Sequence, residues 1–192
     1  TWVFTKHLQD VFGAKLYFQL TDDEKSLWPP PGLAIEEVRH WTRENALDII
    51  ATGFQKGKTV LVTDTQCART LYNIAIEVAK HVTYSTVKAI FGLEDNANIG
   101  IAFFPAMQAV PAFIESRVTG RNVPCLIPAA IDQDPYWRLT RDVAPKIGFL
   151  KPAQIHSRFL PGLLADGKMS ASVPDSAVYT TDDARTAERK IM

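Results

Sequence analysis

The stretch Lys58–Thr63 reads Lys-Thr-Val-Leu-Val-Thr, which is rich in β-branched residues and has an unbroken apolar centre. Such a run is typical of a parallel strand that is buried on both faces. A second β-rich run precedes it at Lys15–Leu20, and a long helical pattern separates the two. Strands that alternate with helices form a parallel sheet covered on both faces. The sequence therefore predicts an α/β fold with a Rossmann-like parallel sheet and helices on both faces.

The rest of the chain continues this alternation. Two further strands are predicted, at Asn122–Ile127, where a proline weakens the pattern, and near Ile155–Phe159. Apolar residues at helical spacing predict helices at Thr5–Phe12, Ala34–Gly53, Ala68–Val82, Ser85–Phe91, Phe103–Ser116 and Asp134–Ile147. Thr21–Glu24 predicts the capped start of another helix, and Trp28–Gly32 predicts a loop. In a sheet of this kind, ligands bind beyond the carboxyl ends of the strands.

Length and composition limit the class of protein. The 192 residues fit one domain, or one domain with a fragment of a second. With 46% hydrophobic and 22% charged residues, the chain can fill a globular core. Zero formal net charge argues against a general polyanion binder but leaves local nucleic-acid contacts open. No apolar run approaches the roughly 18 residues of a membrane span, and no signal peptide opens the chain. We therefore expect a soluble, cytoplasmic protein.

Several reaction classes lose their main support. The four histidines make no metal-ligand spacing, so no permanent metal is predicted. Cys67 and Cys125 lie far apart and are expected to be free thiols. The sequence has no Gly-x-x-x-x-Gly-Lys-Ser/Thr phosphate loop, no Gly-x-Gly-x-x-Gly fingerprint and no Gly-x-Ser-x-Gly elbow. P-loop ATPases, kinases, dehydrogenases and serine hydrolases are disfavoured.

A few polar side chains stand where such a fold would place a binding site. Gln19 lies in a predicted strand, Glu24 opens a helix, Gln108 lies in a strongly apolar helix, and Gln133 follows a strand. A buried glutamine without a partner costs about 1–3 kcal/mol, so Gln108 must find one. Structural roles remain open for these residues, namely a strand position for Gln19, a helix start for Glu24 and a neighbouring carbonyl for Gln108.

The segment Asp166–Ser172 has the composition of a phosphate-handling loop. It contains Lys168, Ser170 and Ser172 within seven residues. Lysine offers a point positive charge and serine offers small donors, so such a loop can follow a polyphosphate during a reaction.

Five collinear segments, spread over nearly the whole chain, carry a family resemblance: Phe4–Phe12, Gln19–Lys25, Ile127–Tyr136, Thr140–Gly148 and Lys168–Ser172. Together they closely resemble the tryptophanyl-tRNA synthetases of the eukaryotic and archaeal branch, which are class I aminoacyl-tRNA synthetases. The last segment, Lys-Met-Ser-Ala-Ser, is similar to one of the two class I signatures. The resemblance implies a Rossmann-like catalytic domain over residues 1–182. It also implies that residues 183–192 begin a C-terminal helical, anticodon-binding region.

The resemblance implies a reaction as well. Tryptophan and ATP, with Mg²⁺ assisting, would give tryptophanyl-adenylate and pyrophosphate, and the tryptophanyl group would then pass to tRNA(Trp). Catalytic roles would fall to Lys168, Ser170 and Ser172, and ATP would be bound by Lys168, Met169, Ser170 and Gln133. A homodimer is the expected assembly.

The resemblance also implies which residues bind tryptophan. Gln19 would accept the indole N–H, and Glu24, Gln108 and Gln133 would hold the amino-acid head group. Phe104 and Pro111 would line the indole slot. Tyrosine-specific relatives usually carry an acidic residue where this chain has Pro111, which accepts no side-chain hydrogen bond, so tryptophan is favoured over tyrosine.

One departure from the family pattern is clear. Class I synthetases carry a second signature, His-x-Gly-His, and these residues do not contain it. We therefore expect this chain to be the central part of a longer enzyme and to be inactive alone. Two alternatives stay open: a non-catalytic binding or signalling fragment, and a tyrosine-specific relative.

Overall fold

The computed structural model describes residues 2–28, 33–159, 161–164, 167, 169 and 173–192. The helices are α1 (Trp2–Phe12), α2 (Glu24–Leu27), α3 (Ile35–Ala51), α4 (Ala68–Ala79), α5 (Tyr84–Phe91), α6 (Ile99–Ala109), α7 (Ile114–Thr119), α8 (Asp134–Val143) and α9 (Ala184–Ile191). The strands are β1 (Leu16–Leu20), β2 (Thr59–Thr63), β3 (Leu126–Ala130) and β4 (Ala153–Ser157). Short 3₁₀ turns occupy Val110–Ala112, Ile131–Gln133, Ala144–Ile147 and Pro174–Ser176.

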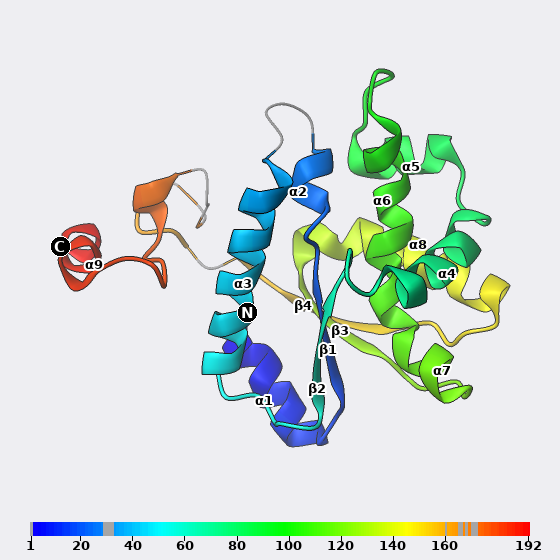
Figure 1. Ribbon diagram of the computed structural model, residues 1–192, viewed down its shortest axis with the longest axis horizontal. Coiled ribbons are helices and arrows are strands. Elements are labelled where there is room, and N and C mark those ends of the chain that lie inside the picture. Colours follow the sequence, from blue (N-terminus) through cyan, green and yellow to red (C-terminus); the bar gives the residue numbers. More distant parts are fainter. Residues whose placement is uncertain (1, 29–32, 160, 165–166, 168, 170–172) are drawn as a thin grey trace.

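The strands pair in parallel, as the sequence predicts. β1 pairs with β2, with Gln19 opposite Val62, and β3 pairs with β4, with Ala129 opposite His156. Within the described residues these strands make two two-stranded sheets and not one continuous sheet. Figure 1 shows α1 and α3 on one side of β1 and β2, and α4 and α6 on the other. The parallel α/β architecture is confirmed, and the division into two pairs is a feature that the sequence did not predict.

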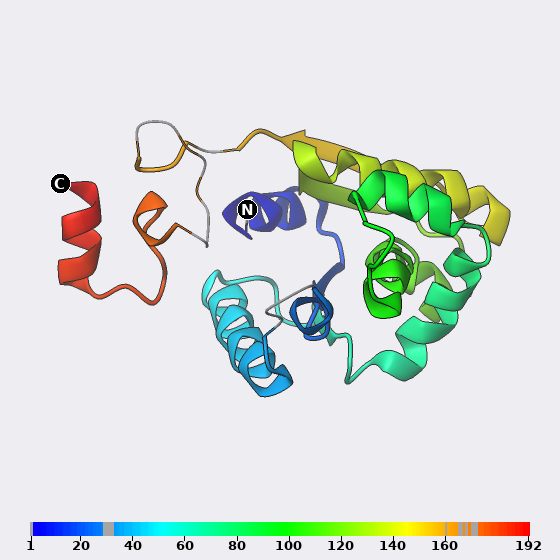
Figure 2. The ribbon, with the colours of Figure 1, turned by 90° about the horizontal axis from the view of Figure 1, so that it is seen from above.

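The core lies between α4, α6 and the turns that flank them. Leu71, Ile74, Val78, Val110 and Phe113 are each at most 1% exposed. The helices α4, α6 and α8 occupy one side of the molecule when it is seen from above (Figure 2). This packing holds α6 beside β1, and it therefore fixes where the residues after Ala106 lie.

Most boundaries agree with the predictions to within a few residues; the fourth strand, predicted near Ile155–Phe159, covers Ala153–Ser157. The larger differences involve prolines or caps. The third strand covers Leu126–Ala130 and not Asn122–Ile127. It contains Pro128, which a strand with a single pairing partner tolerates, because the missing N–H can lie on the unpaired side. The predicted helix Phe103–Ser116 begins earlier, where the Asn98 side chain accepts from the Ile101 N–H at 2.9 Å, and it is broken around Pro111.

Two further boundaries differ. The helix predicted over Asp134–Ile147 ends at Val143 and continues as a 3₁₀ turn that contains Pro145. The predicted cap at Thr21–Glu24 is only partly correct, because the N-cap residue Asp23 makes no capping hydrogen bond with its side chain. The predicted loop at Trp28–Gly32 lies outside the described residues except for Trp28.

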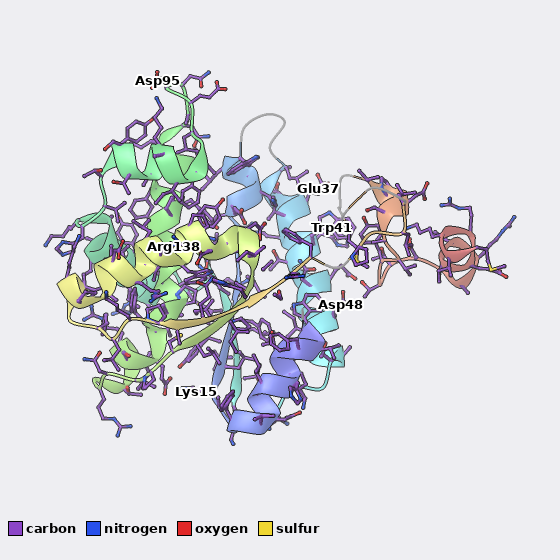
Figure 3. All side chains as sticks on the ribbon, turned by 180° about the vertical axis from the view of Figure 1, so that it is seen from behind. Lys15, Glu37, Trp41, Asp48, Asp95 and Arg138 are labelled. Atoms are coloured by element: carbon purple, nitrogen blue, oxygen red, sulfur yellow. The ribbon has the colours of Figure 1, made fainter. Side chains whose placement is uncertain are left out.

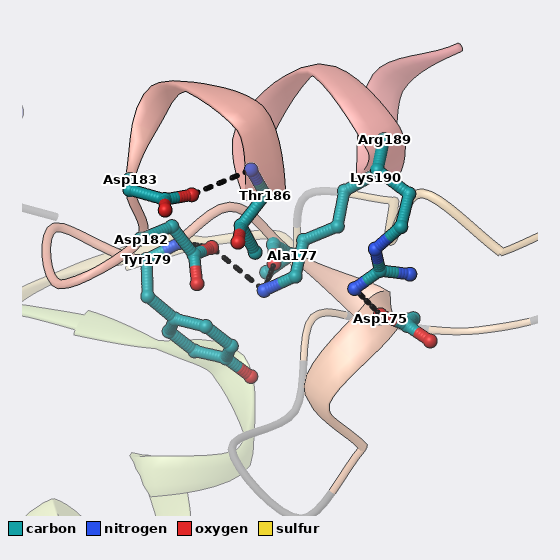
Figure 4. A network of polar contacts seen from close by, with 8 residues as sticks. All are labelled: Asp175, Ala177, Tyr179, Asp182, Asp183, Thr186, Arg189 and Lys190. Atoms are coloured by element: carbon teal, nitrogen blue, oxygen red, sulfur yellow. Dashed lines mark hydrogen bonds and ion pairs between the residues drawn. The ribbon is translucent and has the colours of Figure 1, made fainter.

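The C-terminal residues 173–192 lie to one side of the strands (Figures 1 and 2). Lys190 holds them together: its Nζ donates to Asp182 at 2.6 Å and to the Ala177 carbonyl at 3.1 Å, and it lies 4.5 Å from the centre of the Tyr179 ring (Figure 4). The Thr180 hydroxyl donates to Asp48 on α3 at 2.8 Å, on the face shown in Figure 3. None of the described helices combines the length and apolar character needed to cross a lipid bilayer.

Candidate active site

A cavity of about 770 Å³ lies between the two strand pairs. Successive residues of β1, from Leu16 to Gln19, line it, and so do successive residues at the start of β3, from Cys125 to Pro128. Successive side chains of a strand point to opposite faces. A cavity bordered by every residue of a run therefore lies along the edge of that strand. The facing edges of β1 and β3 form two walls of this cavity.

The strands place Gln19 in this cavity with its amide already anchored. Its Nε2 donates to both carboxylate oxygens of Asp64, at 2.8 and 3.0 Å, and lies 3.4 Å from the Met107 carbonyl oxygen. Within the described residues no donor reaches its Oε1. Gln19 therefore offers the cavity a hydrogen-bond acceptor.

Asp64 is the buried carboxylate behind Gln19. It follows β2 directly and is only 2% exposed. The pKa of Asp64 is raised to about 7, chiefly by burial; the hydrogen bond from Gln19 opposes this rise, and the carboxyl groups of Asp23 and Asp22 add to it. Asp22, which is 1% exposed, accepts hydrogen bonds from the Thr65 N–H, at 2.9 Å, and from the Thr65 hydroxyl.

Two more residues predicted from the sequence, Gln108 and Pro111, also line the cavity. Gln108 is half-buried, and its Nε2 donates to the Gln133 Oε1 at 3.2 Å, so its partner is another predicted site residue. Gln133 itself closes the 3₁₀ turn after β3 and is not among the residues that line the cavity.

Glu24 and Phe104 lie further from the cavity. The Glu24 carboxylate accepts from the Thr21 hydroxyl at 3.1 Å, and Thr21 lines the cavity. Phe104 is 5% exposed and belongs to the core on α6, not to the cavity wall. The structure thus brings Gln19, Gln108 and Pro111 to one cavity, with Gln133 and Glu24 one contact away.

The predicted phosphate-handling residues Lys168, Ser170 and Ser172 lie outside the described residues. Met169 is described, and its side chain is 47% exposed. Among the described residues no group of three or more histidine, cysteine, aspartate or glutamate side chains is arranged to hold a metal ion. Cys67 and Cys125 are free thiols, as predicted, and burial raises the pKa of Cys125 to about 11.

Sequence reasoning missed Asp64 and the trio of Lys15, Tyr17 and Glu115. A polar residue immediately after the buried strand Lys58–Thr63 was the available signal for Asp64, because strand ends face ligands in such sheets. The Tyr17 hydroxyl and the Lys15 Nζ both donate to the Glu115 carboxylate, at 2.5 and 2.8 Å, along the same cavity. These donors, Lys15 first, lower the pKa of Glu115 and keep it ionised.

Comparison with known proteins places the chain in a family. The family model for class I tRNA synthetases (W and Y) matches residues 7–192. A tryptophan–tRNA ligase from Pyrobaculum calidifontis is 50% identical over 190 residues, covering 99% of this chain and 50% of the relative. One from Sulfurisphaera tokodaii is 51% identical over 192 residues, covering 100% of this chain and 49% of the relative. The chain thus spans about half the length of these curated relatives.

Solved structures of tryptophanyl-tRNA synthetases are also similar to this chain along almost its whole length. A tryptophanyl-tRNA synthetase from Encephalitozoon cuniculi, bound to tryptophan, superposes with a TM-score of 0.89 at 36% identity, covering 98% of this chain and 52% of that one. The tryptophanyl-tRNA synthetase from Giardia lamblia gives a TM-score of 0.87 at 37% identity, covering 99% and 54%. From the match over residues 7–192, the chain belongs to the class I tRNA synthetases for tryptophan and tyrosine.

Proposed function

We propose that the protein to which this chain belongs is a tryptophan–tRNA ligase that activates L-tryptophan with ATP and transfers it to tRNA(Trp). The observation that carries this proposal is the identity of about 50%, along almost the whole chain, with ligases named for tryptophan. The acceptor that Gln19 presents in a cavity large enough for an indole supports the same choice of substrate.

In the first step, the tryptophan carboxylate attacks the α-phosphate of ATP. A bond forms between a carboxylate oxygen and the phosphorus, and the bond to the pyrophosphate oxygen breaks. In the second step, a hydroxyl group of the tRNA attacks the activated carboxyl carbon, and AMP leaves. The protein has little covalent work to do, so catalysis rests on positioning and on stabilising charge.

Different residues bind the two ends of tryptophan, the indole ring and the amino-acid head group. Gln19 accepts the indole N–H through its Oε1. The linked amides of Gln108 and Gln133, together with Glu24 beside Thr21, bind the amino-acid head group. By the family resemblance, Lys168, Ser170 and Ser172 would stabilise the departing pyrophosphate, and Met169 and Gln133 would help to bind ATP. Mg²⁺ bound with the ATP would neutralise part of the phosphate charge.

The preference for tryptophan over tyrosine follows from the residues that line the cavity. A buried acceptor that requires an N–H partner penalises side chains that lack one, whereas an apolar wall alone cannot strongly reject a molecule of similar shape. Pro111 lines the cavity and offers no side-chain acceptor to a phenol hydroxyl. Tryptophan is therefore favoured over tyrosine.

We also propose a cytoplasmic homodimer as the working form. On α3, Trp41 (labelled in Figure 3), Leu47 and Ile50 are 45%, 58% and 64% exposed. Such exposed apolar side chains suit contact with a second subunit. Residues 183–192, which include α9, are proposed to begin the anticodon-binding region.

A pyrophosphate-exchange assay tests the proposal. It is run with tryptophan and with tyrosine, on this chain and on a protein extended to the relatives' full length. Exchange with tryptophan only, in the extended protein, is the expected result. Exchange with tyrosine would support the tyrosine-specific alternative, and no exchange with either would support a binding or signalling role.

The role of Gln19 gives a direct prediction. Gln19→Ala should weaken tryptophan binding to the extended protein by about 0.5–1.5 kcal/mol, the net contribution of one hydrogen bond. Isothermal titration calorimetry measures this change. Gln66→Ala, at an exposed glutamine outside the cavity lining, is the matched control and should bind as the wild type does. Unchanged binding in Gln19→Ala would leave Gln19 as a structural strand residue.

A further inference from the structure

The side-chain amide of Gln19 has a donor, the Nε2, and an acceptor, the Oε1. Hydrogen bonds in the structure fix the position of the donor. All the neighbours of its Nε2 are acceptors: the two Asp64 oxygens and the Met107 carbonyl. An ionised carboxylate and a backbone carbonyl accept hydrogen bonds and cannot donate them. While Asp64 is ionised, only the NH₂ end of the amide can face these groups, and the Oε1 points away from them.

Asp64 is well placed to set this orientation without touching a ligand itself. It is 2% exposed and is not among the residues that line the cavity, whereas Gln19 does line it. The parallel register puts Gln19 opposite Val62, two residues before Asp64, so the carboxylate and the amide meet at the ends of neighbouring strands. Among the described residues, Gln19 is thus the cavity-lining residue to which the Asp64 side chain is hydrogen-bonded.

We propose that Asp64 is a positioning residue for side-chain selection: by holding the NH₂ end of Gln19, it turns the Oε1 toward the cavity and makes the site select substrates with an N–H donor. This inference rests on the proposed tryptophan specificity. Without the carboxylate the amide could turn over and present its NH₂ group, which cannot accept the indole N–H. The pocket would keep its shape and lose its preference for an N–H donor.

The carboxyl groups near Asp64 affect whether Asp64 is ionised, and the proposed orientation of Gln19 depends on that. Asp22 and Asp23, which precede α2, are the carboxyl groups that act on Asp64, and both raise its pKa. Burial is the largest cause of that rise, while the amide of Gln19 favours the ionised form. Protonated Asp64 gains an O–H donor that can reach the Gln19 Oε1, so the orientation should be strongest when Asp64 is ionised.

The test is the nearly isosteric variant Asp64→Asn in the extended protein. Its new NH₂ group can donate to the Gln19 Oε1 and so favours the reversed amide. Pyrophosphate exchange is measured with tryptophan and with 3-benzothienylalanine, in which a sulfur replaces the indole N–H. The wild type should prefer tryptophan. In Asp64→Asn the KM for tryptophan should rise about tenfold, kcat should change little, and the KM for the analogue should stay the same.

The double variant Gln19→Ala/Asp64→Asn separates positioning from a general structural role. If Asp64 acts through Gln19, adding Asp64→Asn to Gln19→Ala should leave the preference between the two substrates unchanged. An additional loss of preference in the double variant would overturn the inference, as would equal KM changes for both substrates in Asp64→Asn.

The wild type offers a second readout if Asp64→Asn does not fold. The preference for tryptophan over the analogue should fall as the pH is lowered from about 8 to 6, because Asp64 gains a proton in this range. A preference that does not change over this range would then overturn the inference. Failure of the proposed function looks different, since a wild-type protein without tryptophan-dependent exchange would remove the substrate itself.

Discussion

The extended protein carrying Lys168→Ala should form tryptophanyl-adenylate about 10²–10³ times more slowly than the wild type, which corresponds to about 2.7–4 kcal/mol of transition-state stabilisation. Negative charge accumulates on the pyrophosphate as it leaves, and a cation held beside it is worth more in the transition state than in the ground state. Tryptophan binding should scarcely change, because the proposed contacts to the indole and the head group are made by Gln19, Glu24 and the linked amides of Gln108 and Gln133. Single-turnover adenylate formation and calorimetry measure the two quantities.

Lys151→Ala is the matched control for this variant. Lys151 is an exposed lysine just before β4, and its removal should leave adenylate formation unaltered. A normal rate in Lys168→Ala would remove Lys168 from the mechanism. If tryptophan binding fell by the same factor as the rate, Lys168 would instead contribute to substrate binding in the ground state.

The second large effect concerns stability and comes from Asp64. Its pKa of about 7 in the folded protein lies above the ordinary value of 3.8, so the folded state binds this proton more tightly than the unfolded state does. The stabilisation from protonated Asp64 is complete below about pH 4 and is lost as the pH rises toward 7. Asp64→Asn, which cannot ionise, should not show this loss. Its free energy of unfolding relative to wild type should therefore rise between pH 4 and pH 8, by about 1.4 kcal/mol for each unit of the pKa shift.

Urea unfolding at several pH values measures this difference. Asp10→Asn is the control with the opposite sign, because hydrogen bonds from Lys6, first, and from Gln55 lower the pKa of Asp10. Its stability relative to wild type should fall as the pH rises through the acidic range, where wild-type Asp10 ionises. A difference between Asp64→Asn and wild type that stays constant with pH would contradict the raised pKa.

Much of the fold could be predicted because the local signals are strong. The β-branched run at Lys58–Thr63 and the mixed aromatic run at Lys15–Leu20 each became a strand within one residue of the predicted limits. Pro111 breaks the helix predicted over Phe103–Ser116, whereas Pro105 stays inside α6, so the missing proline donor does not by itself decide where a helix ends. Strand pairing could not be predicted in full, because the hydrogen bonding that divides four strands into two pairs depends on long-range contacts.

The site was predictable only in part, for a related reason. Gln19, Gln108 and Pro111 could be carried over from a resemblance, and the structure places all three on one cavity. Asp64 was not predicted, since its role depends on an amide 45 positions away in sequence. Phe104 was predicted to line the cavity, yet its helical face points into the core, because the packing of α6 against α4 decides which side of an almost uniformly apolar helix is buried.

The most direct test is a crystal structure of the extended protein with tryptophan and a non-hydrolysable ATP analogue. The indole should lie in the cavity between β1 and β3, with its nitrogen within about 3.2 Å of the Gln19 Oε1, and the amino group should lie near Gln108 and Gln133. Tryptophan bound elsewhere, or with its indole nitrogen turned away from Gln19, would contradict the account.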